Sequence, residues 1–254
     1  MSALAIVTGD GPEHRHVAKS LLDAYPGATV FLCDPIPPRS AGKVLRRSPA
    51  AFPSKLARRA YLSAIGDAAS ARRSKERLLT GVGPLPASAR VVPVGRPRAG
   101  RLLAEMERLR PDVIAVYGTG LIPDAVLAQA RLKALNLHTG LSPAYRDTAC
   151  CLWPLAEGRP EMAGATIHEC TSDLDGGAIY WQRATGARPG DDVHAVFARA
   201  VAAGAEAYPG IVADCLAGRL EGRPQDLSQG REYRGADLGV MTEWRARRTL
   251  ARLL

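Results

Sequence analysis

The chain has 254 residues, of which 46% are hydrophobic and 23% charged, a composition typical of a soluble globular protein with a substantial core. No stretch reaches the roughly 18 consecutive apolar residues that a membrane span requires, and the opening run MSALAIVTGDG is too short for a signal peptide. We therefore expect a cytoplasmic protein that does not contact membranes. The net charge of +9 is compatible with a surface that binds nucleic acid.

Strands and helices alternate through the first half of the sequence. Short apolar runs predict strands at residues 3–9, 28–34, 89–95, 111–120 and 132–138, the first of them buried. Apolar residues at helical spacing predict helices at residues 14–25, 100–110 and 122–130. This alternation predicts an α/β protein with a Rossmann-like, mostly parallel sheet and helices on both faces. Ligands of such folds bind at the carboxyl ends of the strands.

A basic insert at about residues 35–80 interrupts the alternation. It is expected to hold one or two helices, broken by Pro49 and Pro53. Its densest charge runs from Arg39 to Leu79, with few aromatic side chains that could stack on bases. We therefore interpret this cluster as a solvated helical face, with phosphate binding as the alternative.

The second half of the chain continues the pattern with longer elements. A strand is expected at residues 176–184 and a helix at residues 191–218, with a break near Pro209. The tail at residues 222–254 is expected to form a hairpin-like piece and a final basic helix. We divide the chain into a main domain at residues 1–218 and a short C-terminal extension at residues 219–254.

The five cysteines are interpreted as structural. They form no Cys-x-x-Cys pair, so the spacing that zinc and redox sites use is absent. The neighbours Cys150 and Cys151 could form a metal site or a strained disulfide, but buried thiols that pack as small hydrophobes are favoured. We therefore predict no metal site.

Three polar residues near predicted strand ends suggest acyl transfer. Asn136 and His138 point to the same face of an extended strand because side chains alternate. An amide such as Asn136 can stabilise an oxyanion, and an imidazole such as His138 can take a proton near neutral pH. The carboxylate of Asp175 could orient that imidazole. The alternative is structural: Asn-x-His as a hydrogen-bonded strand end, and DLDGG as a turn.

Two longer segments favour the catalytic interpretation. The segments NLHTGLSPAYRDTACCLWPLAEG and GATIHECTSDLDGGAIY resemble the 10-formyltetrahydrofolate-dependent formyltransferase family. This family includes the catalytic domains of methionyl-tRNA formyltransferase, glycinamide ribonucleotide formyltransferase and the sugar N-formyltransferases. The resemblance covers about residues 3–205 and implies the formyltransferase fold, with Asn136, His138 and Asp175 as the catalytic residues and residues 1–218 as the catalytic domain.

The resemblance also implies a formyl donor, 10-formyltetrahydrofolate, and an amine acceptor. Glycines let a flat pterin approach the main chain closely, so the donor is expected against two loops. The expected donor-binding residues are Tyr117, Gly118, Thr119, Gly120, Leu121, Ile122, Cys170, Thr171, Ser172 and Asp173. His168 is expected to support one of these loops rather than to take part in chemistry.

Departures from the family pattern bear on the acceptor. Where the family has Arg-Gly in the loop after the Asn-x-His motif, this chain has Arg146-Asp147. The tail after Gly218 is too short for the separate C-terminal domain of methionyl-tRNA formyltransferase. We therefore expect a primary amine on a small or medium acceptor, such as an amino sugar or a secondary-metabolite amine.

Two rival functions remain open. Water could replace the amine, which would make the protein a 10-formyltetrahydrofolate hydrolase. Alternatively, the basic surface could belong to an RNA-directed or tRNA-directed binding protein on the same fold. A homodimer is also left open.

Overall fold

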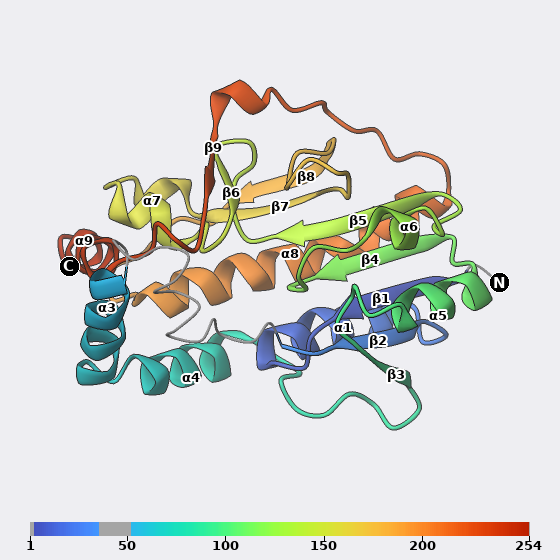
Figure 1. Cartoon of the computed structure of the whole chain (residues 1–254), viewed down its shortest axis with the longest axis horizontal. Helices are drawn as coiled ribbons and strands as arrows, with labels where there is room; N and C mark the ends of the chain where they lie inside the picture. The colour runs from blue at the N-terminus through green and yellow to red at the C-terminus, as the bar shows by residue number, and fades with distance from the viewer. Residues whose placement is uncertain (1–2, 36–51, 254) are drawn as a thin grey trace.

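The computed structural model describes residues 3–35 and 52–253, and a seven-stranded sheet forms its centre (Figure 1). In spatial order the strands are β3 (Arg90–Gly95), β2 (Thr29–Cys33), β1 (Leu4–Thr8), β4 (Val113–Tyr117), β5 (Lys133–His138), β7 (Gly164–Glu169) and β8 (Ile179–Ala184). The first five run parallel, whereas β7 and β8 are antiparallel to their neighbours. The predicted mostly parallel sheet is therefore confirmed.

Helices cover both faces of this sheet, as the alternating pattern predicted. On one face, α1 (Pro12–Ala24) and α8 (Val193–Leu216) bury Leu21 and Tyr208 against the strands. On the other face, α5 (Arg101–Leu109) and α6 (Asp124–Leu127) bury Leu102, Met106 and Val126. Each helix turns one apolar stripe toward the sheet, and the burial of those stripes holds the layers together.

Helix α8 runs through Pro209 without the predicted break. A proline has no N–H, so the carbonyl of Ala205, four residues earlier, has no helical donor. The Oγ of Ser20 in α1 donates to that carbonyl at 2.6 Å, and the hydroxyl of Tyr25 donates to the carbonyl of Pro209 at 3.0 Å. The Ser20 contact replaces the missing hydrogen bond, and both contacts attach α1 and the residue after it to α8.

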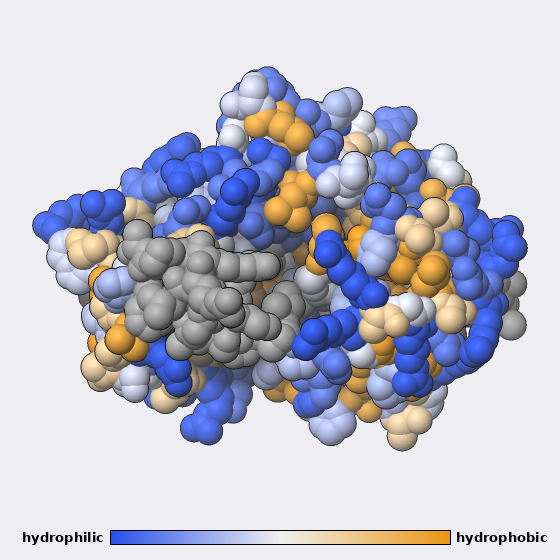
Figure 2. Space-filling view, viewed as in Figure 1, coloured by the Kyte–Doolittle hydropathy of each residue, from blue (hydrophilic) through white to orange (hydrophobic). Residues whose placement is uncertain are grey.

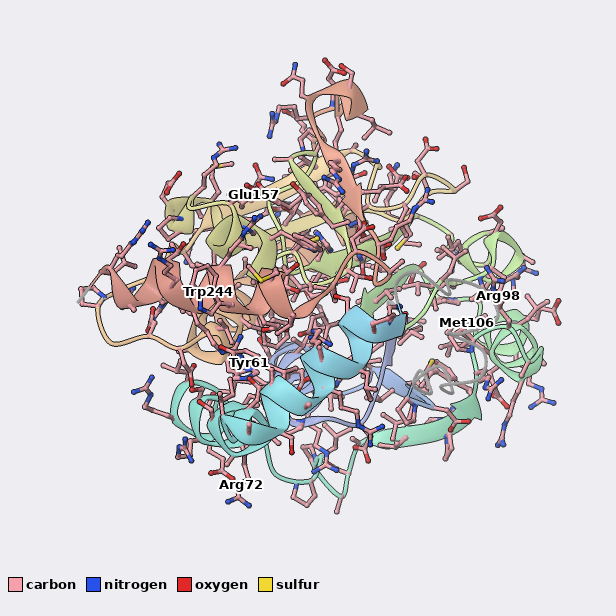
Figure 3. The ribbon with its side chains drawn as sticks, turned by 60° about the vertical axis from the view of Figure 1, so that its left-hand side comes forward. Tyr61, Arg72, Arg98, Met106, Glu157 and Trp244 are labelled. Carbon is pink, nitrogen blue, oxygen red and sulfur yellow. The ribbon has the colours of Figure 1, made fainter. Side chains whose placement is uncertain are left out.

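The basic insert forms two helices where the structure describes it, α3 (Phe52–Ala64) and α4 (Asp67–Leu78). Pro53 is the second residue of α3, where proline is tolerated, so it does not break the helix. Pro49 lies outside the described residues. Arg58 forms an ion pair with Glu243 at 2.6 Å, whereas Arg72 points outward from α4 (Figure 3).

The tail does not form the predicted hairpin. Strand β9 (Arg231–Tyr233) pairs in parallel with β6 (Tyr145–Asp147), a strand far earlier in the chain. The predicted final helix is present as α9 (Val240–Ala251), which packs on α7 (Leu152–Ala156). Two single 3₁₀ turns, η2 (Pro160–Met162) and η3 (Leu227–Gln229), complete the elements of the part of the chain that the structure describes.

The surface seen in Figure 2 is mostly hydrophilic, in agreement with a sequence of which 23% is charged. Hydrophilic side chains cover most of the face seen in Figure 2, with smaller hydrophobic groups between them. Among the helices of residues 3–35 and 52–253, none has both the length and the apolar character to cross a bilayer. All five cysteines carry free thiols, and only Cys170 is partly exposed.

Candidate active site

A cavity of about 600 Å³ opens at the carboxyl ends of β4 and β5. It lies beside the point where the strand order reverses, between β1 and β4, the position at which open α/β sheets bind their ligands. Its walls come from the start of α1, the loop after β4, the end of β5 and the loops that carry Asp147 and Asp175. Sequence-distant segments therefore meet at one site.

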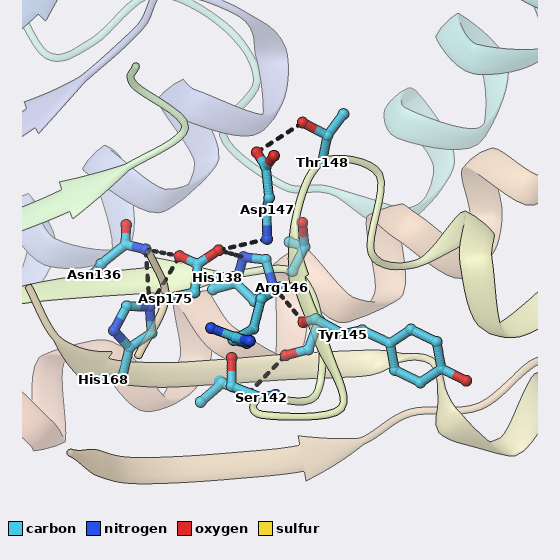
Figure 4. A network of polar contacts seen from close by, with 12 residues as sticks. Asn136, His138, Ser142, Tyr145, Arg146, Asp147, Thr148, His168 and Asp175 are labelled. Atoms are coloured by element: carbon cyan, nitrogen blue, oxygen red, sulfur yellow. Dashed lines mark hydrogen bonds and ion pairs between the residues drawn. The ribbon is translucent and has the colours of Figure 1, made fainter. Parts of the chain in front are cut away.

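The three predicted catalytic residues come together in this cavity (Figure 4). The Nδ1 atom of His138 lies 3.3 Å from Oδ2 of Asp175. The Nδ2 of Asn136 donates to Oδ1 of the same carboxylate at 3.4 Å. Both β5 side chains reach Asp175 because alternate residues of a strand share one face.

Asp175 is held as a carboxylate. Burial alone would raise its pKa, but the charges of His138 and His168 and the N–H of Asp147 lower the pKa well below its usual range. That N–H donates to Oδ2 at 2.8 Å. Gln225, in the segment after α8, donates through Nε2 to the main-chain carbonyl of Asp175 at 2.9 Å.

His138 is enclosed, with 7% of its surface exposed. Its Nε2 lies 3.0 Å from the carbonyl oxygen of Tyr145, which can only accept, so Nε2 carries a proton. Burial lowers the pKa of His138, and the charge of Asp175 opposes that effect. The ring can therefore be neutral at rest and still hold a second proton between two acceptors.

His168 takes a larger part in the site than the sequence predicted. It lies on β7 directly opposite Asn136 in the antiparallel pairing with β5. Its Nδ1 faces the carbonyl of Glu169 at 2.8 Å. Its Nε2 lies 3.1 Å from Nδ2 of Asn136 and 3.3 Å from Oδ1 of Asp175, so His168 contacts two of the three predicted catalytic residues.

Most of the predicted donor-binding residues line the cavity. The lining members are Tyr117, Gly118, Thr119, Gly120, Leu121, Ile122, Cys170, Thr171 and Asp173. Ser172 is exposed on the same loop and does not line the cavity, so its role in donor binding stays a prediction. Burial raises the pKa of the Cys170 thiol, which keeps it protonated.

Gly118 has a further reason to be glycine. Its φ is +63°, and a Cβ atom there would lie 2.5 Å from Nε2 of His14. The ring of His14 lies 3.1 Å from the Gly118 carbonyl and packs on Tyr117. Sequence reasoning did not identify His14, because nothing in the sequence indicates that α1 meets the loop after β4.

No group of three or more metal-ligating side chains occurs within residues 3–35 and 52–253. The carboxylates and imidazoles of the site contact one another instead, as the distances above show.

Comparison with known proteins bears on this geometry. Residues 92–212 match the model of the formyl transferase family. The chain carries a formyl transferase domain. The matched segment of this domain contains Asn136, His138 and Asp175, and the resemblance seen in the sequence motifs is confirmed.

Relatives and solved structures extend the comparison. The domain is 37% identical over 148 residues to a methionyl-tRNA formyltransferase from Anaeromyxobacter sp. (strain K), covering 56% of this chain and 47% of the relative. The chain thus spans about half the length of the relatives it matches.

Two solved structures share the fold. An N-formyltransferase from Helicobacter canadensis, in complex with folinic acid and dTDP-3-aminofucose, aligns with a TM-score of 0.61 at 11% identity, over 97% of this chain and 80% of that one. Glycinamide ribonucleotide transformylase 1 from Symbiobacterium toebii aligns with a TM-score of 0.58 at 21% identity, over 89% and 95%. The formyl transferase domain therefore has the formyltransferase fold.

Proposed function

We propose that the chain is an N-formyltransferase that moves a formyl group from 10-formyltetrahydrofolate to a primary amine of a small or medium acceptor. The observation that carries the proposal is that Asn136, His138 and Asp175 contact one another in the lining of one cavity. The match of residues 92–212 to the formyl transferase family supports it.

The cavity suits a folate. Ile122, Leu127 and Phe197 give it an apolar wall, and the Gly118–Gly120 stretch exposes main-chain groups at its edge. An apolar slot with a few polar groups is what a flat heterocycle with one polar edge requires. The donor would supply the formyl group, and the residues of this chain would orient it.

Each of the three residues has a role in transfer. The two hydrogens of the Asn136 amide contact His168 and Asp175, and the contact with Asp175 is long, at 3.4 Å. The amide can keep its contact with His168 and turn the other hydrogen from Asp175 to the formyl oxygen as negative charge develops there. His138 takes a proton from the attacking amine and returns it to the departing folate nitrogen. Asp175 stabilises the imidazolium that forms between those two steps.

An amino sugar or a secondary-metabolite amine is the proposed acceptor. The Helicobacter canadensis neighbour was solved with an aminosugar nucleotide, which supports a small amine. Hydrolysis of the donor is not favoured, because the matching family and the neighbours named above are transferases.

A nucleic-acid acceptor is less well supported. Lys75 pairs with Glu13 at 2.8 Å, and Arg58 pairs with Glu243, so part of the basic insert attaches α3 and α4 to the domain. RNA binding would fall steeply with added salt, whereas folate binding to an apolar cavity would persist. That contrast separates the two interpretations.

The test is calorimetric binding of a non-hydrolysable 10-formyltetrahydrofolate analogue to the wild-type chain and to Asn136→Ala. The wild type is expected to bind, and the variant to bind more weakly, because one hydrogen-bond donor to the formyl oxygen is lost. Absence of binding by a folded wild-type chain would refute the proposal.

A further inference from the structure

Asp147 has a backbone conformation that disfavours any residue with a side chain. Its φ is +78°, in the left-handed region that glycine occupies freely and that aspartate enters only at some energetic cost. The family motif has glycine at this position, so this chain carries a carboxylate where the conformation does not call for one. Strained residues of this kind concentrate at functional sites.

The carboxylate of Asp147 faces the cavity. Its main-chain N–H donates to Asp175, and its side chain extends away from that residue (Figure 4). The Oγ1 of Thr148 donates to Oδ1 at 2.9 Å. Within the described part of the chain, no lysine or arginine forms an ion pair with Asp147, and Oδ2 accepts no hydrogen bond.

The surroundings of Asp147 favour an incoming cation. Burial raises its pKa, and the hydrogen bond from Thr148 opposes this rise. The negative charges of Asp175 and of Glu232 on β9 raise the pKa further, whereas the charge of His138 lowers it. A positive group placed at this carboxylate would relieve the repulsion, and a primary amine in neutral water arrives as an ammonium ion.

We propose that Asp147 selects the acceptor by binding its protonated primary amine at Oδ2. This inference rests on the proposed formyl transfer and adds that the acceptor binds in its protonated, positively charged form. One N–H bond of the ammonium breaks, leaving its electron pair on nitrogen, and the proton passes through Asp147 to solvent. The freed pair attacks the formyl carbon, and the next amine proton goes to His138 and then to the folate nitrogen as its bond to the formyl carbon breaks.

Two variants and two amines test this selection. Asp147→Asn and Asp147→Gly remove the charge but keep the N–H that holds Asp175. Ethylamine and methoxyamine are of similar size, but only ethylamine is largely protonated at neutral pH. With 10-formyltetrahydrofolate as donor, both variants are expected to lower the ratio of kcat/KM for ethylamine to that for methoxyamine at least about tenfold, the effect of one lost charged contact.

Glu232→Gln is the matched control. It removes a nearby negative charge on β9 that does not line the cavity and that is paired with Arg146 and Arg234. It is therefore expected to lower the ratio far less than the Asp147 variants do. An unchanged ratio in the Asp147 variants, or an equal fall in the control, would overturn the inference.

Where turnover of such small amines is too slow to measure, a binding experiment tests the role of Asp147. Ethylammonium, titrated by NMR into the chain loaded with the folate analogue, is expected to bind the wild type more tightly than Asp147→Asn. Equal affinities would overturn the role of Asp147 and leave the proposed transferase intact. A wild-type chain that does not bind the analogue would instead remove the proposed function itself, and this inference with it.

Discussion

The hydroxyl of Tyr208 allows a test of how strands β4 and β5 are held together next to the site. Tyr208 lies on α8 and is fully buried. Its oxygen accepts from the N–H of Val116 on β4 at 3.0 Å and donates to the carbonyl of Leu135 on β5 at 2.8 Å. One side chain thus joins two neighbouring strands just before Asn136.

Tyr208→Phe would leave both main-chain groups without this partner and would not admit water. A buried polar group that loses its partner costs about 1–3 kcal/mol, so for the two groups together the free energy of unfolding should fall by about 2–6 kcal/mol. For a chain of this size, that corresponds to a fall in Tm of about 5–25 °C. Thermal and urea unfolding followed by circular dichroism measure it.

Tyr25→Phe is the control for this prediction. The Tyr25 hydroxyl also donates to a main-chain carbonyl, that of Pro209, but from a partly exposed ring. Water can replace that contact, so a loss under about 1 kcal/mol is expected. If the two variants lose equal stability, the bridge between β4 and β5 does not stabilise the sheet as argued.

Three further predictions concern the site. His138→Ala and Asp175→Asn should each lower formyl transfer at least about a hundredfold with unchanged circular dichroism, on the usual scale of acid–base catalysis; near-normal turnover would contradict their roles. Gly118→Ala should weaken calorimetric binding of the folate analogue at least about tenfold, because the new methyl group would meet His14 and the backbone would be strained; unchanged affinity would show that the loop can move. Because the pKa of Asp175 is lower in the folded chain than in the unfolded one, its ionised form contributes stability above about pH 4 that is lost as the pH falls further. Urea midpoints between about pH 6 and pH 3 should therefore fall less steeply in Asp175→Asn, and parallel curves would count against a depressed pKa.

Much of the sheet was predictable because its strands are buried on both faces. The runs that became β1 and β4 are nearly continuous apolar segments, and helices on either side impose that pattern. The shared orientation of Asn136 and His138 followed from strand alternation alone. Asp175 needed the family resemblance, since its sequence context is equally that of a turn.

The features that could not be predicted from the sequence depend on contacts between segments that are far apart in the chain. The position of His168 opposite Asn136 comes from the antiparallel register of β5 and β7, which no local pattern specifies. The pairing of β9 with β6 is likewise non-local, and the tail therefore resembled a hairpin. The helix through Pro209 persists because Ser20, on another helix, supplies the missing donor.

The short pairing of β6 with β9 implies that the two halves of the site can change independently. The proposed donor side is built from the loops after β4 and β7, whereas Asp147 is the last residue of β6 and pairs with Tyr233 of β9. Gln225 in the same late segment supports the main chain at Asp175. Insertions or substitutions between α8 and α9 that keep Gln225 could thus reshape the proposed acceptor side and leave the proposed folate site unchanged, so that one donor could serve different amines.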